Sequence, residues 1–235
     1  MKGSTKDFFN QESTRYEQFV KGRDFVLSLK EKVNPLLKGR VLDVGSGCIA
    51  DFKDGFFDLY IGLDLSLGML LGLPREEKIK PVCGDAMGLP FQDGSMDVVI
   101  YRAILHHLNP GGKAPHEMEG VVRLAFSEAR RVVRKDGQIL VIEPCLPPLL
   151  VGFERWFGFF IRFVMRCLNL PYVFIFSRDS LSKLLGRGGW IFLKTDHIEG
   201  TGRAWEWIQP ILGLPFIKIP RWTSPSKTYL FQGRK

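Results

Sequence analysis

The chain has 235 residues, of which 45% are hydrophobic and 25% charged, and this is enough to bury the core of one large domain. Its net charge is +8, and no apolar run reaches the roughly 18 uninterrupted residues that a membrane-spanning helix needs. The cysteines are widely spaced and form no C-x-x-C pair and no cluster with histidine, which argues against a disulfide scaffold and against a metal site: Cys48, Cys83, Cys145 and Cys167.

The N-terminal part, residues 1–38, has no apolar stretch of the kind that a secretory signal contains. Together with the cysteine pattern, which suits a reducing compartment, this predicts a cytoplasmic protein. We expect residues 1–38 to form a helical lid on a single domain that spans residues 1–235.

Five apolar runs of strand length follow in chain order, and helical patterns separate them. They cover residues 40–45, 59–65, 80–86, 96–105 and 137–144. Before the last run, residues 117–135 carry apolar side chains at helical spacing, and Asp136-Gly137 is expected to end that helix. Strands that are apolar nearly throughout and alternate with helices predict an α/β fold with a parallel sheet covered on both faces.

Glycines and acids follow three successive strands of this predicted sheet. Gly45 and Gly47 come after the first strand, Asp64 ends the second and Asp85 ends the third. In such a sheet a ligand binds beyond the carboxyl ends of the strands, where a carboxylate can bridge two ribose hydroxyls. A single glycine turn is weak evidence, and each aspartate alone could be a helix cap or a turn residue. Three such strand ends in succession favour a nucleoside site.

The chain resembles class I S-adenosylmethionine-dependent methyltransferases, most closely the small-molecule branch that includes quinone and sterol methyltransferases. The resemblance covers roughly residues 38–198 and rests on four motifs: VLDVGSGC, IGLDLSLGML, GDAMGLPFQDGSMDVVIYRAILHHL and FSEARRVVRKDGQILVIEP. It implies a Rossmann-like, seven-stranded, mostly parallel sheet with helices on both faces and an antiparallel last strand. Residues 189–199 and 226–234 would be the last two strands, and residues 178–189 the helix before them.

The resemblance also implies S-adenosylmethionine as the cofactor and assigns its contacts. Asp64 would hold the ribose hydroxyls, Asp85 with Ala86 the adenine, and Leu65 would also contact the cofactor. Arg102 would lie near the methionine end of the cofactor. The methionine part itself would lie against Asp43, Gly45, Ser46 and Gly47.

The acceptor is expected to lie just past the fourth strand, next to His106 and His107. A histidine is suited to remove a proton from a phenol or enol acceptor. In the family that the chain resembles, such a pair often serves the strand-to-helix turn, so a structural role stands ahead of a catalytic one. Tyr101 and Arg102 are competing candidates for holding an acceptor oxygen, and Glu143 is either a polar group of the site or a structural anchor.

Two features depart from the family pattern. Ile49 stands where a third glycine is usual, and Tyr101-Arg102-Ala103 replaces a segment that is usually small and polar. They keep two alternatives open: a non-catalytic lipid- or protein-binding module on a decayed methyltransferase scaffold, and an enzyme that uses S-adenosylmethionine for other chemistry on a quinone-like substrate.

The segment FERWFGFFIRFVMRCLNL, residues 153–170, predicts an apolar helix with one narrow cationic stripe formed by Arg155, Arg162 and Arg166. Residues 145–177 and 200–225 are expected to be cap insertions beside the acceptor pocket. We interpret residues 149–176 and 207–222 as elements that meet an anionic membrane surface, which would place the protein at the inner face of the membrane. The alternative is a plain core helix.

The basic excess lies entirely in the second part of the chain. Up to Pro144 there are 20 Lys/Arg and 20 Asp/Glu, and from Cys145 onward 13 and 5. Nucleic acid is not the expected partner, because the fourth strand ends in YRAI rather than in the N/D-P-P-Y/F motif of amino-methylating enzymes. The sequence therefore predicts a methyltransferase for a hydrophobic small molecule, such as a quinone, an isoprenoid or another lipid-like acceptor.

Overall fold

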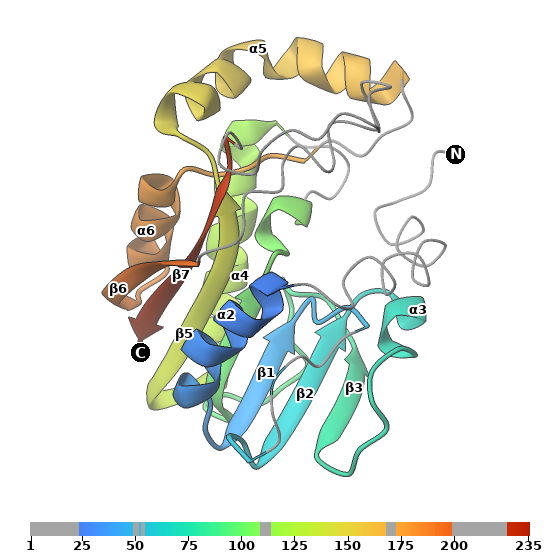
Figure 1. The fold of residues 1–235 in the computed structure, drawn as a ribbon. Helices are drawn as coiled ribbons and strands as arrows, with labels where there is room; N and C mark the ends of the chain where they lie inside the picture. The colour runs from blue at the N-terminus through green and yellow to red at the C-terminus, as the bar shows by residue number, and fades with distance from the viewer. Residues whose placement is uncertain (1–23, 49–51, 53–54, 109–113, 168–172, 199–224) are drawn as a thin grey trace.

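The computed structural model describes residues 24–48, 52, 55–108, 114–167, 173–198 and 225–235. Within them a seven-stranded sheet has the order β3-β2-β1-β4-β5-β7-β6 (Figure 1). The strands are β1 (Arg40–Val44), β2 (Leu59–Asp64), β3 (Ile79–Cys83), β4 (Met96–Arg102), β5 (Val133–Cys145), β6 (Ile191–Ile198) and β7 (Lys227–Arg234).

Strands β1 to β5 pair in parallel, whereas β7 runs antiparallel to both β5 and β6. The predicted Rossmann-like sheet, mostly parallel and with an antiparallel last strand, is confirmed. The parallel strands all point toward the same edge of the sheet, and their carboxyl ends therefore meet there.

The predicted boundary between the helix at residues 117–135 and the strand at residues 137–144 was wrong. Helix α4 (Pro115–Val132) ends before residue 135, and β5 begins at Val133. Asp136 adopts a left-handed conformation, with φ of 61°. A Cβ on Gly137 would lie 2.4 Å from Val133 Cγ1, so only glycine fits there. Asp136-Gly137 therefore bends a strand, at a place where the β4–β5 register shifts, and does not end a helix.

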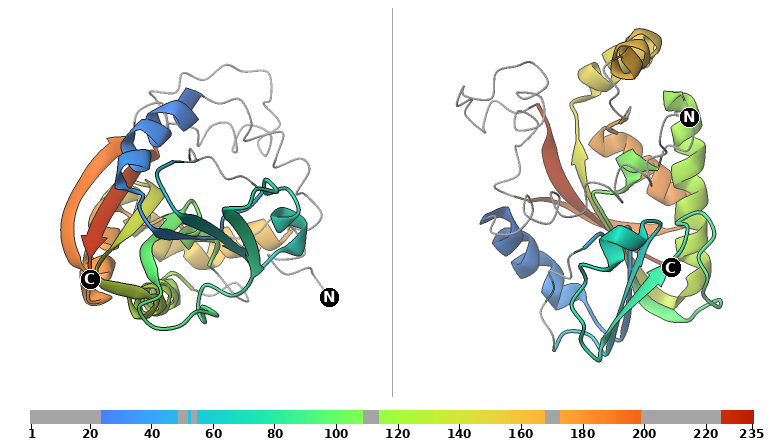
Figure 2. Two further views of the ribbon diagram at one scale, coloured as in Figure 1. Left: turned by 90° about the horizontal axis from the view of Figure 1, so that it is seen from below. Right: turned by 90° about the vertical axis from the view of Figure 1, so that its right-hand side faces the viewer.

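Helices cover both faces of the sheet (Figure 2). Helices α4 and α6 (Arg178–Arg187) lie on one face. Trp190, which follows α6, donates its indole N–H to Phe126 O of α4 at 3.1 Å. Helix α2 (Asp24–Val33) covers the other face, where Leu29 and Val33 are buried. Short helices are also present: η1 (Asn34–Leu36), α3 (Leu67–Leu70) and η2 (Leu105–His107).

Side chains of β4 alternate between these two hydrophobic cores. Val99 and Tyr101 belong to the core under α4, whereas Val98 and Ile100 belong to the core under α2. Successive residues of a strand point to opposite faces, so Tyr101 and its neighbour Arg102 cannot serve the same side of the sheet.

Helix α5 (Pro148–Cys167) lies across the end of the molecule toward which the parallel strands point (Figures 1 and 2). One side of it faces the domain, where Val151, Glu154 and Gly158 are buried. Large apolar side chains on the remaining surface are exposed, and Trp156 and Phe159 reach 88% and 80%. The others are Leu149, Leu150, Phe153, Phe157, Phe160 and Phe163. Among the residues that the structure describes, this exposure argues against the plain core helix.

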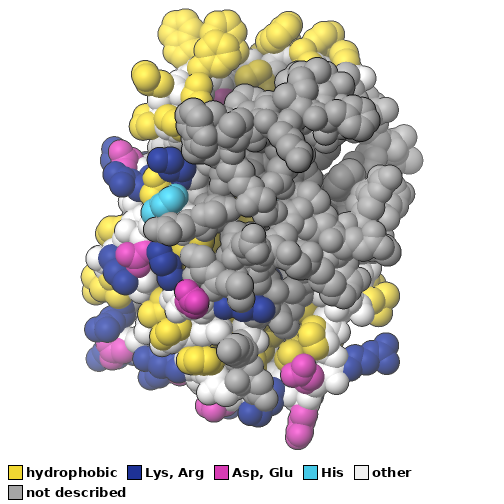
Figure 3. All heavy atoms as spheres, viewed as in Figure 1, with side chains coloured by type: hydrophobic (Ala, Val, Ile, Leu, Met, Phe, Trp, Pro, Cys, Tyr) yellow, Lys and Arg dark blue, Asp and Glu magenta, His cyan; other side chains and the backbone are white. Residues whose placement is uncertain are grey.

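Two arginines of α5 have partners within the fold. Arg155 forms an ion pair with Glu119 of α4, and Arg162 donates to Gly158 O of its own helix at 3.2 Å. Hydrophobic side chains gather at this end of the molecule, as Figure 3 shows.

None of the helices that the structure describes is long and apolar enough to cross a bilayer. Several predictions concern residues outside the described ranges. These are the larger part of the N-terminal lid, Ile49, the insertion at 200–225 with its apolar stretch 207–222, and the side chain of Arg166.

Candidate active site

The turn after β1 is built around Gly45. Gly45 has φ of 69°, in the left-handed region that favours glycine, and a Cβ there would lie 2.4 Å from Ile104 Cγ1. The N–H groups of Gly45 and Ser46 both donate to Leu63 O, at 2.7 and 3.1 Å. The glycine is thus required twice, for its backbone conformation and for the close approach of Ile104.

Asp64, at the end of β2, is joined to this turn. Its Oδ2 accepts from Gly47 N at 3.1 Å, and its Oδ1 accepts from Ser66 N at 2.8 Å. Burial raises the pKa of Asp64, and the N–H donors of Ser66 and Gly47 act in the opposite direction. The structure therefore brings the acid of the second strand end beside the glycines of the first, as the sequence predicts.

Asp43 and Arg102 face each other across β1 and β4. Asp43 is fully buried, and its Oδ2 accepts from Tyr60 OH at 2.5 Å. Arg102 Nη2 lies 3.5 Å from the same oxygen and donates to Ser46 O at 3.3 Å. The Arg102 guanidinium also lies over the ring of Phe52, 5.5 Å from its centre. Arg102 is therefore held against the glycine turn.

The third strand end lies beside the second. Gly84 N donates to Asp64 O at 3.1 Å. Asp85 is exposed, and its Oδ1 accepts from Met87 N at 2.9 Å. Ala86 is buried, whereas the side chain of Leu65 is 46% exposed. These residues offer a carboxylate beside an apolar surface, which suits a nucleobase.

Tyr101, a candidate from the sequence for holding an acceptor oxygen, does not lie at the site. It is fully buried, its hydroxyl donates to Ala125 O at 2.8 Å, and its ring packs edge-on against Phe126 of α4. Because it points to the α4 face, it is a core residue, and a role in holding the acceptor is at odds with this placement.

His106 is paired with Glu143, a residue whose role the sequence leaves open. Glu143, at the end of β5, places Oε2 at 2.7 Å from His106 Nδ1. Its other oxygen, Oε1, accepts from Ile104 N and Leu105 N, each at 2.6 Å. Glu143 thus anchors the turn that follows β4 and contacts the predicted base at the same time. Its position at a strand end was the only sequence signal for this.

His107 packs beside His106, with ring centres 4.1 Å apart. Burial lowers the pKa of His107 well below its ordinary value, and the neighbouring His106 lowers it further. His107 is therefore neutral at physiological pH, and the structure distinguishes two residues that the sequence treats alike.

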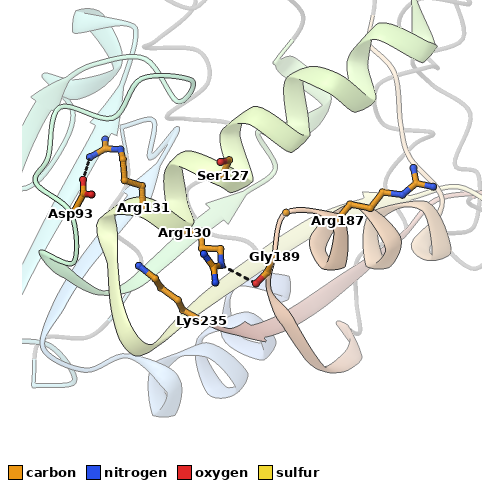
Figure 4. A pocket seen from close by; sticks show the side chains of 8 residues that line it. Asp93, Ser127, Arg130, Arg131, Arg187, Gly189 and Lys235 are labelled. Atoms are coloured by element: carbon orange, nitrogen blue, oxygen red, sulfur yellow. Dashed lines mark hydrogen bonds and ion pairs between the residues drawn. The ribbon is translucent and has the colours of Figure 1, made fainter.

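A different depression lies at the opposite edge of the sheet (Figure 4). It measures about 480 Å³, and residues at the amino end of β4 and at the ends of α4, α6 and β7 line it. Three of its cations already have partners in the fold: Arg131 pairs with Asp93 and Glu128, Arg130 donates to Gly189 O, and Lys235 donates to Val133 O. We therefore place the site at the carboxyl ends of the strands.

The residues at these strand ends suit S-adenosylmethionine. Gly45 leaves the turn after β1 without a side chain where the amino-acid part would lie, the Asp64 carboxylate can bridge two hydroxyls, and the exposed side chain of Leu65 offers an apolar face to the adenine. A seven-stranded sheet of this order with this set of strand ends defines a class I S-adenosylmethionine-dependent methyltransferase.

Comparison with known proteins names the family. Residues 42–141 match the methyltransferase-domain family. The demethylmenaquinone methyltransferase of Renibacterium salmoninarum is 37% identical over 182 residues, which cover 68% of this chain and 70% of that protein. The chain belongs to this family of S-adenosylmethionine-dependent methyltransferases.

Two further comparisons bear on the extent of the likeness. The demethylmenaquinone methyltransferase of Beutenbergia cavernae is 35% identical over 127 residues, so the match spans 52% of this chain and about half, 48%, of that relative. The fold matches geranyl diphosphate C-methyltransferase from Streptomyces coelicolor A3(2), solved with Mg²⁺, geranyl diphosphate and S-adenosyl-L-homocysteine. The TM-score is 0.61 with 12% identity, covering 88% of this chain and 78% of that one.

Proposed function

We propose that the protein transfers a methyl group from S-adenosylmethionine to a hydrophobic quinone-type acceptor in its reduced, hydroxyl-bearing form. The observation that carries the acceptor class is the 37% identity to a protein named demethylmenaquinone methyltransferase. The exposed apolar surface of α5 beside the site supports a hydrophobic acceptor.

When bound, S-adenosylmethionine supplies an electrophilic methyl group on a sulfonium, and positioning accounts for much of the rate of such an in-line displacement. In this proposal the chain does three things. The glycine turn and Asp64 hold the cofactor, and Arg102 orders the turn through Ser46 O. His106 removes the proton that the acceptor loses as the new bond to the methyl carbon forms.

We further propose that the protein takes its acceptor from an anionic membrane surface. An interfacial helix buries an apolar face at the headgroup boundary and is rich in Trp and Phe, as the exposed surface of α5 is. The basic excess of the chain lies wholly in its second part, which includes α5. Cationic residues near such a surface are attracted by its negative potential.

The acceptor proposal is tested by incubating the protein with S-adenosylmethionine and chemically reduced demethylmenaquinone in detergent micelles. Mass spectrometry should show a product heavier by one methyl group, and the Asp64→Ala variant serves as the matched control. A protein that binds S-adenosylmethionine in calorimetry but leaves the quinol unchanged would contradict the acceptor class and leave the family intact.

A further inference from the structure

Glu143 uses both carboxylate oxygens within one turn. The residue is 2% exposed and comes from the end of β5. Oε1 accepts the N–H groups of Ile104 and Leu105, and Oε2 faces His106 Nδ1 at 2.7 Å. Two backbone N–H groups and one imidazole nitrogen thus converge on one buried carboxylate.

The contact with His106 has a chemical consequence. A carboxylate oxygen only accepts hydrogen bonds, so the imidazole nitrogen that faces Glu143 must carry a hydrogen. In a neutral histidine only one ring nitrogen is protonated, so the other, Nε2, is left with its lone pair. Glu143 therefore selects the tautomer in which His106 is a base through Nε2.

The turn that Glu143 holds adjoins the cofactor turn. Ile104 packs so closely against Gly45 that a Cβ on this glycine would lie 2.4 Å from Ile104 Cγ1, and His106 follows two residues later. Ala103, just before, has φ of 51°, a conformation that a non-glycine residue rarely adopts. Such strain persists only where the surroundings impose it. Here Glu143 accepts hydrogen bonds from the two residues that follow, Ile104 and Leu105, and so helps to hold Ala103 in this conformation.

We propose that Glu143 is a positioning residue for the methyl transfer, fixing His106 with Nδ1–H toward the carboxylate and Nε2 free to take the acceptor's proton. This inference rests on the proposed function. The acceptor atom bonds to the methyl carbon as the carbon–sulfur bond breaks, and that electron pair returns to sulfur. The acceptor's proton passes to Nε2, and the resulting imidazolium remains paired with Glu143 until solvent removes the proton.

The test is Glu143→Gln. The amide oxygen can still accept from Ile104 N and Leu105 N, so its NH₂ group must face His106 Nδ1 and demands the opposite tautomer. With Nε2 protonated, general-base catalysis is lost, and kcat should fall by about 10²- to 10⁴-fold. The KM for the quinol, the melting temperature and the affinity for S-adenosylmethionine should stay near those of the wild type.

Two readouts separate this role from a structural one. ¹⁵N NMR of the imidazoles, assigned by the loss of signals in His106→Gln, should show Nδ1–H in the wild type and Nε2–H in Glu143→Gln. Glu143→Asp, which restores a carboxylate, should recover part of kcat. Glu117→Gln is the matched control, because Glu117 also accepts a backbone N–H, from Ala114, and has no part in the proposed site.

The inference is overturned if His106 carries its hydrogen on Nε2 in the wild type, or if Glu143→Gln swaps the tautomer and kcat does not change. The tautomer measurement needs no turnover. A wild type that shows Nδ1–H but methylates no quinol would therefore refute the proposed acceptor and support the positioning of His106.

Discussion

The carboxylate of Asp64 accepts a hydrogen bond at 3.1 Å from the backbone N–H of Gly47, which lies 17 residues earlier in the chain. This bond connects the ends of two parallel strands, and it fixes an acid beside the turn that would hold the amino-acid part of the cofactor. The first predictions concern this acid.

Asp64→Ala should weaken S-adenosylmethionine binding by about 1.5–3 kcal/mol, the range for a hydrogen bond to a charged group, which is about a ten- to hundredfold rise in Kd. Calorimetry measures this directly. Asp85→Ala should cost less, because Asp85 is exposed and the adenine also has apolar contacts. An unchanged Kd for Asp64→Ala would refute the ribose assignment.

The affinity for S-adenosylmethionine should also depend on pH through Asp64. Burial raises the pKa of this carboxyl above its ordinary value of 3.8. The charged form makes the stronger bonds to hydroxyls, so affinity should fall as the pH decreases through the raised pKa, at a pH above 3.8. Asp64→Asn should bind weakly and without this dependence. The measurement is a series of titrations down to the lowest pH at which the protein stays folded.

His106→Ala should lower kcat strongly and leave cofactor binding intact, because it removes the proposed base but no contact of the glycine turn. His107→Gln should lower kcat much less, since the lowered pKa of His107 makes it a weak base. Steady-state kinetics with the reduced quinone measure both. Near wild-type turnover in both variants would assign the pair to the turn alone.

Tyr101→Phe tests the placement of this residue in the core. The change removes the hydroxyl that donates to Ala125 O and keeps the ring against Phe126. The free energy of unfolding should decrease by about 0.5–1.5 kcal/mol, the net value of a typical hydrogen bond, and kcat should stay as in the wild type. A selective loss of turnover in a variant of unchanged stability would return Tyr101 to the acceptor site.

The double change Phe159→Ser and Phe160→Ser should abolish binding to anionic vesicles and leave the melting temperature unchanged, because these side chains are 80% and 63% exposed. Wild-type binding, measured by co-sedimentation, should weaken with salt as surface attraction is screened. Val151→Ser, on the buried side of the same helix, is the control that should lower the melting temperature. A wild type that ignores vesicles but dimerises through α5 would assign this surface to a second copy.

The strand-end acids and glycines could be predicted from the sequence because their positions follow from strand length alone. The end of α4 could not, since Asp136-Gly137 has the same local preference whether it ends a helix or bends a strand. Only the pairing of β5 with β4 decides between them.

Tyr101 and Glu143 show a second limit. Alternation along β4 separates Tyr101 from Arg102, but the sequence does not say which face carries α4. Glu143 meets His106 across 37 residues, and this contact depends on the register of β5 against β4 and on the turn after β4, neither of which local pattern determines.

The position of β7 in the sheet has a consequence for the order in which the protein folds. Residues 227–234 come last among the described elements, yet they lie between β5 and β6. On a ribosome, β1 to β5 can pair as they are made, but β6 has no neighbour in the sheet until β7 has emerged. During that interval the edge of β5 and the apolar side chains of β6 are exposed to solvent, and Ile191 and Leu193 remain exposed even in the finished fold. The slowest and most aggregation-sensitive step of folding should therefore be the insertion of this single strand.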